Sequence, residues 1–262
     1  LDSLEVWSNR YLDDGSVVAD GLGGVSLFVN GSVGGMQSSL GGQPTNLDGV
    51  VISANGIEKA KAVGEQIALV VLEALKTAPE VKAPKLAFGA QRLKVAVENT
   101  RIQVTYLALE LFTRLVEFDK TKDVSAENMP RIPTEIAKIH VGPLRFLAVP
   151  GELLPELAVG YDAKWAFGKP QISPSNQDPP DLSKAPGPPY LKDQLGGEMP
   201  CVLGLANDEL GYLIPPYDFK THPDAPYLEE ADGHHYEETN SVGASAVPQL
   251  LEAYKKLLAW QP

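Results

Sequence analysis

Short apolar runs that stop at glycine, proline or a polar turn constrain this chain more than any other feature. Three of them, Gly24–Asn30, Leu144–Val149 and Val202–Ala206, are too short for core helices and predict buried strands. The chain also has 24 glycines and 22 prolines, so its regular elements must alternate with turns and loops. The pattern therefore predicts a core built on short strands.

Two segments have helical spacing instead. One runs from Val247 to the C-terminus, and the other, Ile57–Thr77, has an apolar face made of Ala60, Val63, Ile67, Val70, Val71 and Ala74. Strands followed by amphipathic helices predict an α/β fold, a mixed layered sheet with flanking helices and long Pro/Gly-rich loops. We expect residues 1–262 to form one domain.

A β-hairpin is predicted where Ile136–Val141, which alternates with period two, meets Leu144–Val149 across Gly142-Pro143. Lys85–Gly89 and Leu93–Val97 are further candidate strands. After the hairpin, Leu153 begins a predicted short helix that ends near Val159.

Residues 168–200 are rich in proline, which is excluded from helix interiors and central strands. We therefore expect one long extended loop here, serving as a lid, a binding surface or an interface.

Composition excludes several classes of function. Lys and Arg number 22 against 34 Asp and Glu, so the net charge is -12. Binding to nucleic acid, or to an anionic membrane by charge, is therefore not expected. No apolar run approaches the ~20 residues of a membrane span, and the single Cys201 excludes a disulfide framework or a cysteine zinc cluster.

Four segments that follow apolar runs are candidate site segments, and each also has a plain structural interpretation. Asn30–Gly35 offers backbone N–H groups to a ligand, or is simply a tight turn. Glu152, after Pro150-Gly151, lies at a sheet edge where ligands bind, or is a carboxylate at a helix N-terminus. Ala206–Tyr212 places polar residues between strands, or is a hairpin turn. His234–Asn240 has metal-binding residue types, or is solvated.

Taken together, the short motifs in these segments and their order along the chain resemble the neutral/alkaline ceramidase family of zinc-dependent amidases. The matching sequences are Phe-Val-Asn-Gly-Ser-Val-Gly-Gly at 28–35, Val-Pro-Gly-Glu at 149–152, Gly-Leu-Ala-Asn-Asp-Glu-Leu-Gly-Tyr-Leu-Ile at 204–214 and Tyr-Glu-Glu-Thr-Asn-Ser at 236–241. The resemblance runs from about residue 24 to the end and covers the later part of that family's catalytic domain.

The resemblance implies roles for individual residues. Glu152 and Tyr212 correspond to zinc ligands, Tyr236 to a residue beside the reacting carbonyl, and Asn30 to a further catalytic position. The implied activity is hydrolysis of an amide bond in an N-acyl, small or lipid-like substrate, with zinc-bound water as the nucleophile. Tyr236 would donate to the developing oxyanion.

Two features depart from the family pattern. Its two zinc-binding histidines precede the Phe-Val-Asn-Gly segment, and none of His140, His222, His234 and His235 matches them. Leu1 is neither an initiator Met nor part of a visible signal peptide. We therefore expect an N-terminal fragment of the same protein to supply the histidines. Gly35–Ser38 replaces an Asp-Val-Ser-like segment, which leaves the substrate open.

By resemblance, an extracytoplasmic location, secreted or periplasmic, is expected. The competing hypothesis is a non-catalytic binding or structural subunit that keeps the scaffold without the histidines and uses residues 168–200 as its interaction surface. A calcium-binding protein is less favoured, because no Asp-x-Asp-x-Asp-Gly loop occurs.

Overall fold

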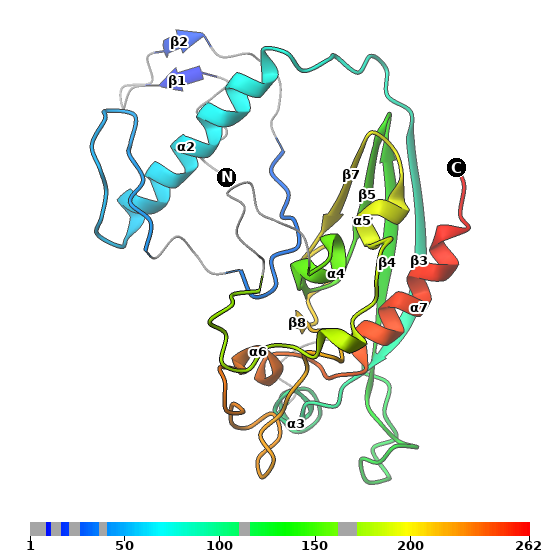
Figure 1. The fold of residues 1–262 in the computed structure, drawn as a ribbon. Coiled ribbons are helices and arrows are strands. Elements are labelled where there is room, and N and C mark those ends of the chain that lie inside the picture. The colour runs from blue at the N-terminus through cyan, green and yellow to red at the C-terminus, as the bar shows by residue number, and fades with distance from the viewer. Residues whose placement is uncertain (1–8, 12–16, 21–26, 37–40, 110–115, 162–171) are drawn as a thin grey trace. The chain divides into compact units, whose positions relative to one another are not determined.

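The computed structural model describes residues 9–11, 17–20, 27–36, 41–109, 116–161 and 172–262. By contacts, the chain divides into two compact units. The first combines Leu1–Val29 with Gln37–Lys82, and the second combines Asn30–Met36 with Ala83–Pro262. Both units contain strands and helices (Figure 1), so the predicted α/β fold is confirmed.

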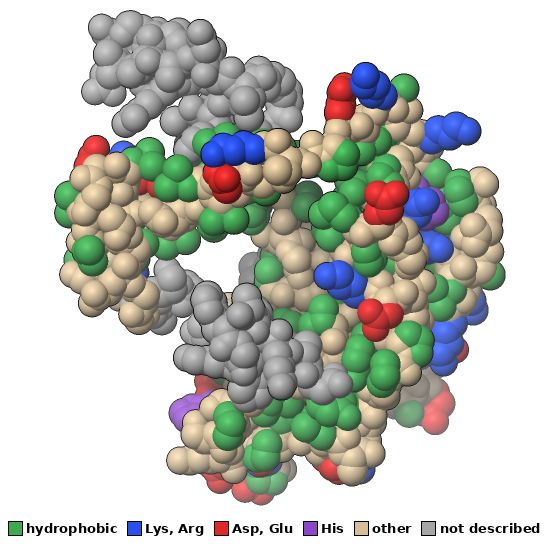
Figure 2. All heavy atoms as spheres, turned by 45° about the horizontal axis from the view of Figure 1, so that its top comes forward, with side chains coloured by type: hydrophobic (Ala, Val, Ile, Leu, Met, Phe, Trp, Pro, Cys, Tyr) green, Lys and Arg blue, Asp and Glu red, His purple; other side chains and the backbone are tan. Residues whose placement is uncertain are grey.

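The first unit pairs β1 (Asn9–Tyr11) with β2 (Val17–Asp20) in antiparallel fashion and contains the long helix α2 (Ile57–Leu75). The helix confirms the prediction from spacing, but its buried side carries Lys59, Ala62 and Ala68 rather than the larger apolar residues. Val70 on the predicted apolar face is 70% exposed. Figure 2 shows hydrophobic side chains at the surface of this unit.

The prediction of a buried strand at Gly24–Asn30 is wrong for the residues of this run that the structure describes. Residues 24–26 lie outside the described part, and Leu27, Phe28 and Val29 are exposed and form no regular strand. A strand needs a partner for its backbone groups, and none of the described strands pairs with these residues.

The second unit is built on a four-stranded sheet of order β3-β4-β5-β7. Its strands are β3 (Leu86–Ala96), β4 (Arg131–Val141), β5 (Leu144–Ala148) and β7 (Met199–Leu203). β4 and β5 form the predicted antiparallel hairpin, and β5 pairs with β7 in parallel. The two strands expected at 85–89 and 93–97 are one continuous strand, β3, in register with β4.

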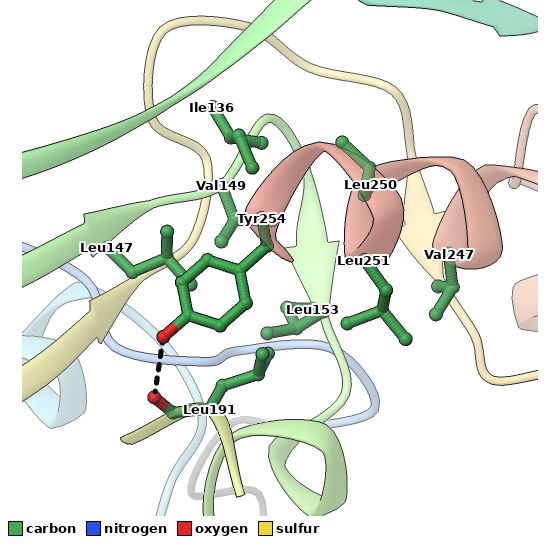
Figure 3. A pocket seen from close by; sticks show the side chains of 9 residues that line it. All are labelled: Ile136, Leu147, Val149, Leu153, Leu191, Val247, Leu250, Leu251 and Tyr254. Atoms are coloured by element: carbon green, nitrogen blue, oxygen red, sulfur yellow. Dashed lines mark hydrogen bonds between the residues drawn. The ribbon is translucent and has the colours of Figure 1, made fainter. Parts of the chain in front are cut away.

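The helix α7 (Ala246–Leu258) closes the core of this unit, as its apolar spacing predicts. Leu250, Tyr254 and Leu257 are buried with the sheet residues Ile136 and Leu147. Figure 3 shows Tyr254 reaching over the core to donate a hydrogen bond of 3.3 Å to the backbone oxygen of Leu191. The cavity beneath the helix measures about 20 Å³ and is lined by apolar side chains, so it is core packing and not a ligand site.

The proline-rich segment is only partly the extended loop that we expected. Residues 168–171 lie outside the described part. The later residues form a short 3-10 turn (Leu182–Lys184), the helix α5 (Leu191–Leu195) and the start of β7 at Met199. The prediction of irregular structure is wrong at this end because residues 190–199 contain no proline, and Leu191 and Leu195 are buried in the core. Among the described residues, no helix has the length and apolar character to cross a bilayer.

We expect Leu250→Ala to lower the free energy of unfolding by about 2–5 kcal/mol, because it leaves a cavity beneath α7. Urea denaturation followed by circular dichroism measures the loss. The matched control is Leu228→Ala, since Leu228 is 61% exposed and its truncation should cost less than about 0.5 kcal/mol. Equal losses in the two variants would contradict this account of the core.

Candidate functional site

Backbone segments cross closely just beyond the ends of β5 and β7. The N–H of Gly204 donates to the oxygen of Gly31 at 3.0 Å, and that of Gly34 donates to Leu153 at 2.9 Å. A Cβ at Gly34 would lie 2.4 Å from the backbone oxygen of Glu152, so only glycine permits this approach. The glycine turn predicted at 31–35 is thus confirmed, and it packs against the segment that contains Glu152.

Glu152 and Tyr212 lie directly opposite each other on two short parallel strands, β6 (Glu152–Leu153) and β8 (Tyr212–Leu213). Leu153 and Leu213 are buried, whereas Glu152 and Tyr212 are half-buried. Because successive strand residues point to opposite sides, the carboxylate and the phenol share the other side of the pair. Two sequence interpretations are therefore wrong. Glu152 lies in a strand and not at a helix N-terminus, and Ala206–Tyr212 is not a hairpin turn, because β8 pairs with β6 and not with β7.

Tyr236 joins this pair from a third segment. It is the first residue of the short helix α6 (Tyr236–Thr239), and its hydroxyl oxygen lies 3.1 Å from that of Tyr212. The two rings meet edge to face, with centroids 5.6 Å apart. Asn30 has an exposed side chain that forms no hydrogen bond with these three residues, and the neighbouring Gly31 bonds to Gly204 instead. The structure therefore brings together three of the four predicted residues.

The surroundings of Tyr212 are acidic. Burial raises the pKa of its phenol well above the usual value, and the hydrogen bond with Tyr236 and the carboxylates of Glu152 and Glu237 raise it further. Burial likewise raises the pKa of Glu209, with a contribution from Glu152, and it raises the pKa of Glu237. The carboxylates of Glu152, Glu209 and Glu237 near Tyr212 favour a bound cation, because a cation would offset their mutual repulsion.

The carboxylate of Glu152 and the phenol oxygen of Tyr212 are oxygen donors, a ligand type that divalent cations accept. In the part of the chain that the structure describes, no group of three His, Cys, Asp or Glu side chains is arranged to hold a metal. The histidines have other surroundings: His140 contacts Trp260, and His222 accepts hydrogen bonds from its own turn. The imidazole ligands that the resemblance implies do not come from these positions.

Sequence reasoning missed two acidic features of this region. His235, which we interpreted as solvated if not metal-bound, is buried between Asp178 and Glu238. Glu156, in the helix α4 (Pro155–Val159), is only 8% exposed. The spacing of His235 and Glu238 on one helix turn was a possible signal, but nothing in the sequence indicates that Asp178 packs beside them.

Comparison with protein-family models, with curated protein sequences and with solved structures found no match to this chain.

We expect Gly34→Ala to lower the free energy of unfolding by about 1–3 kcal/mol, because the new methyl group overlaps the backbone of the Glu152 strand. Gly31→Ala is the matched control in the same segment, since a Cβ at Gly31 meets no atom within 4 Å. Chemical denaturation of both variants measures the difference. If Gly34→Ala were as stable as Gly31→Ala, the close approach described here would be wrong.

The buried carboxyl of Glu156 should make stability depend on pH. Burial raises its pKa from 4.5 to about 7, with a further contribution from Asp218. The folded state therefore holds a proton that the unfolded chain releases, so this stabilisation is complete below pH 4.5 and is lost as the pH rises through 7.

We expect Glu156→Gln to be more stable than the wild type above pH 7, by on the order of 1–3 kcal/mol, and the advantage to disappear near pH 4.5. Denaturation across this pH range measures the difference. Glu252→Gln, on the exposed side of α7, is the control and should follow the wild type. A Glu156→Gln variant with the same pH dependence as the wild type would contradict the prediction.

Proposed function

We propose that this chain forms part of a zinc-dependent amide hydrolase of the ceramidase-like type. The observation that carries the proposal is the register of β6 and β8, which sets Glu152 opposite Tyr212, with the hydroxyl of Tyr236 3.1 Å from that of Tyr212. These residues were selected from the sequence by their resemblance to the family. Their meeting in space, in acidic surroundings, supports the roles that the resemblance implies.

In this proposal the carboxylate of Glu152 and the oxygen of Tyr212 hold the zinc ion. Both are hard oxygen donors, and an adjacent cation would offset the burial and the nearby carboxylates that raise the pKa of Tyr212. When bound, zinc supplies a Lewis acid that polarises an amide carbonyl and activates water. Tyr212 must lose its proton on binding, so zinc affinity should rise with pH.

Tyr236 acts on the substrate in this proposal. Its hydroxyl is half-buried and is fixed beside Tyr212 by the hydrogen bond and by the edge-to-face ring contact. From this place it can donate a hydrogen bond to an amide oxygen as negative charge develops there. The side-chain amide of Asn30 is proposed as a second contact to the substrate. The hydrogen bond between Gly31 and Gly204 holds the backbone next to Asn30 in place.

The remaining parts of the proposal lie outside this chain. Two imidazole ligands would come from an N-terminal fragment of the same protein, the substrate would be a small or lipid-like N-acyl amide, and the site would act in an extracytoplasmic compartment. The non-catalytic binding subunit is the outcome if zinc does not bind.

We expect Tyr212→Phe and Glu152→Gln each to weaken zinc binding at least tenfold, because each removes one anionic oxygen ligand. Competition with a chromophoric chelator, measured on the full chain together with the N-terminal fragment and repeated from mildly acidic to mildly alkaline pH, gives the affinities. In the wild type the affinity should increase with pH.

Tyr227→Phe is the matched control, because Tyr227 is another half-buried tyrosine of the same unit whose ring contacts Phe219. This variant should bind zinc like the wild type. If the wild type bound no zinc with the histidine-bearing N-terminal fragment present, or if Tyr212→Phe bound it unchanged, the hydrolase proposal would be wrong and the chain would be a non-catalytic subunit.

A further inference from the structure

A buried histidine lies immediately before Tyr236 and bridges two carboxylates. The Nδ1 atom of His235 is 2.8 Å from Oε1 of Glu238, and its Nε2 atom is 2.9 Å from Oδ2 of Asp178. Glu238 is on α6 itself, whereas Asp178 is 57 positions away in the proline-rich segment. His235 therefore ties the start of α6 to a distant part of the chain.

The rest of this cluster holds the same bridge in place. The ammonium of Lys220 pairs with the carboxylate of Asp178 and donates to the backbone oxygen of Asp232 at 3.2 Å. The backbone N–H of Lys220 donates to Oε1 of Glu238 at 3.0 Å. A Cβ at Gly233 would lie 2.6 Å from that of Asp178, so the chain before His235 also packs closely on this residue.

The helix α6 needs such anchors because it has only four residues and one turn is not stable alone. Its C-terminal end is held by the buried Asn99, whose side-chain amide donates to the backbone oxygens of Thr239 and Ser241 at 3.0 and 2.8 Å. Its N-terminal end, where Tyr236 lies, is held by His235. The Tyr236 side chain is thus fixed between two anchors that belong to different parts of the fold.

We propose that His235, bridged to Asp178 and Glu238, is a positioning residue that holds the hydroxyl of Tyr236 against Tyr212. The catalytic meaning of this role rests on the proposed function, but the positioning itself is a property of this chain without metal or substrate.

The bridge depends on the protonation state of the imidazole. A cationic imidazole donates from both nitrogens, whereas the neutral form donates from only one. Burial lowers the pKa of His235, but its hydrogen bonds to Asp178 and Glu238 outweigh this and raise the pKa overall. The other charged groups facing it are Lys220, Glu237 and Asp218, and burial raises the pKa of Asp218 to about 7. The bridge is therefore complete at low pH and loses one hydrogen bond as the pH rises.

Tyrosine Cζ resonances of the zinc-free full chain, labelled with ¹³C, test the proposal. The signals of Tyr212 and Tyr236 are assigned from their loss in Tyr212→Phe and Tyr236→Phe. In His235→Gln and in Asp178→Asn we expect both signals to move, because the hydroxyl of Tyr236 no longer keeps its place 3.1 Å from that of Tyr212. In the wild type, the Tyr236 signal should also follow the titration of His235.

Asp181→Asn is the matched control, because Asp181 lies in the same segment but its carboxylate bonds to Ser183 and Lys184 of its own turn. It should leave both tyrosine signals unchanged. Asp178→Asn keeps the test decisive if His235→Gln does not fold, since the side chain of Asp178 is 36% exposed. Unchanged Tyr212 and Tyr236 signals in a folded variant would overturn the proposal.

This experiment is separate from the test of function because no metal is present. Moved tyrosine signals in a chain that binds no zinc even with the N-terminal fragment present would keep the positioning role and end the hydrolase proposal. Unmoved signals in a chain that binds zinc through Tyr212 would do the reverse.

Discussion

The close approach of backbones at glycine is the constraint on which the candidate site depends. Gly34 lies against the Glu152 strand, and Gly211 lies so near Asn240 that a Cβ would come within 1.9 Å of its backbone oxygen. Gly211 also has a φ of +77°, which favours glycine. These contacts let four segments meet where the sheet ends. The register that sets Glu152 beside Tyr212 follows from them, because the N–H of Glu152 donates to Gly211.

The charges around the site follow from this geometry. The crossing brings the half-buried Glu152, Tyr212 and Glu237 together beside Glu209, and loss of solvent is the first reason that the pKa of Tyr212, Glu209 and Glu237 is raised. Burying acidic groups together destabilises the folded state. Such arrangements are typical of binding and catalytic sites. The His235 bridge has a different character, because there both carboxylates bond to the imidazole and Asp178 also pairs with the ammonium of Lys220.

Local sequence patterns predicted individual helices and the hairpin, whereas long-range packing determines how distant segments pair. The spacing at α2 and α7 and the hairpin of β4 and β5 depend on neighbours in the chain, so the sequence sufficed for them. The convergence of Glu152, Tyr212 and Tyr236 was predicted only through a family resemblance, since no pattern specifies how β6 pairs with β8. The strand expected at Gly24–Asn30 shows the opposite case, in which the apolar residues 27–29 pair with none of the described strands and are exposed.

The central claim is that Glu152 and Tyr212 share one zinc ion. Anomalous diffraction at the zinc edge, from crystals of the full chain grown with zinc, tests it most directly. The account predicts an anomalous peak between the carboxylate of Glu152 and the hydroxyl oxygen of Tyr212, within about 2.0–2.2 Å of each. Zinc bound only elsewhere on the chain, with these two side chains free of metal, would contradict it.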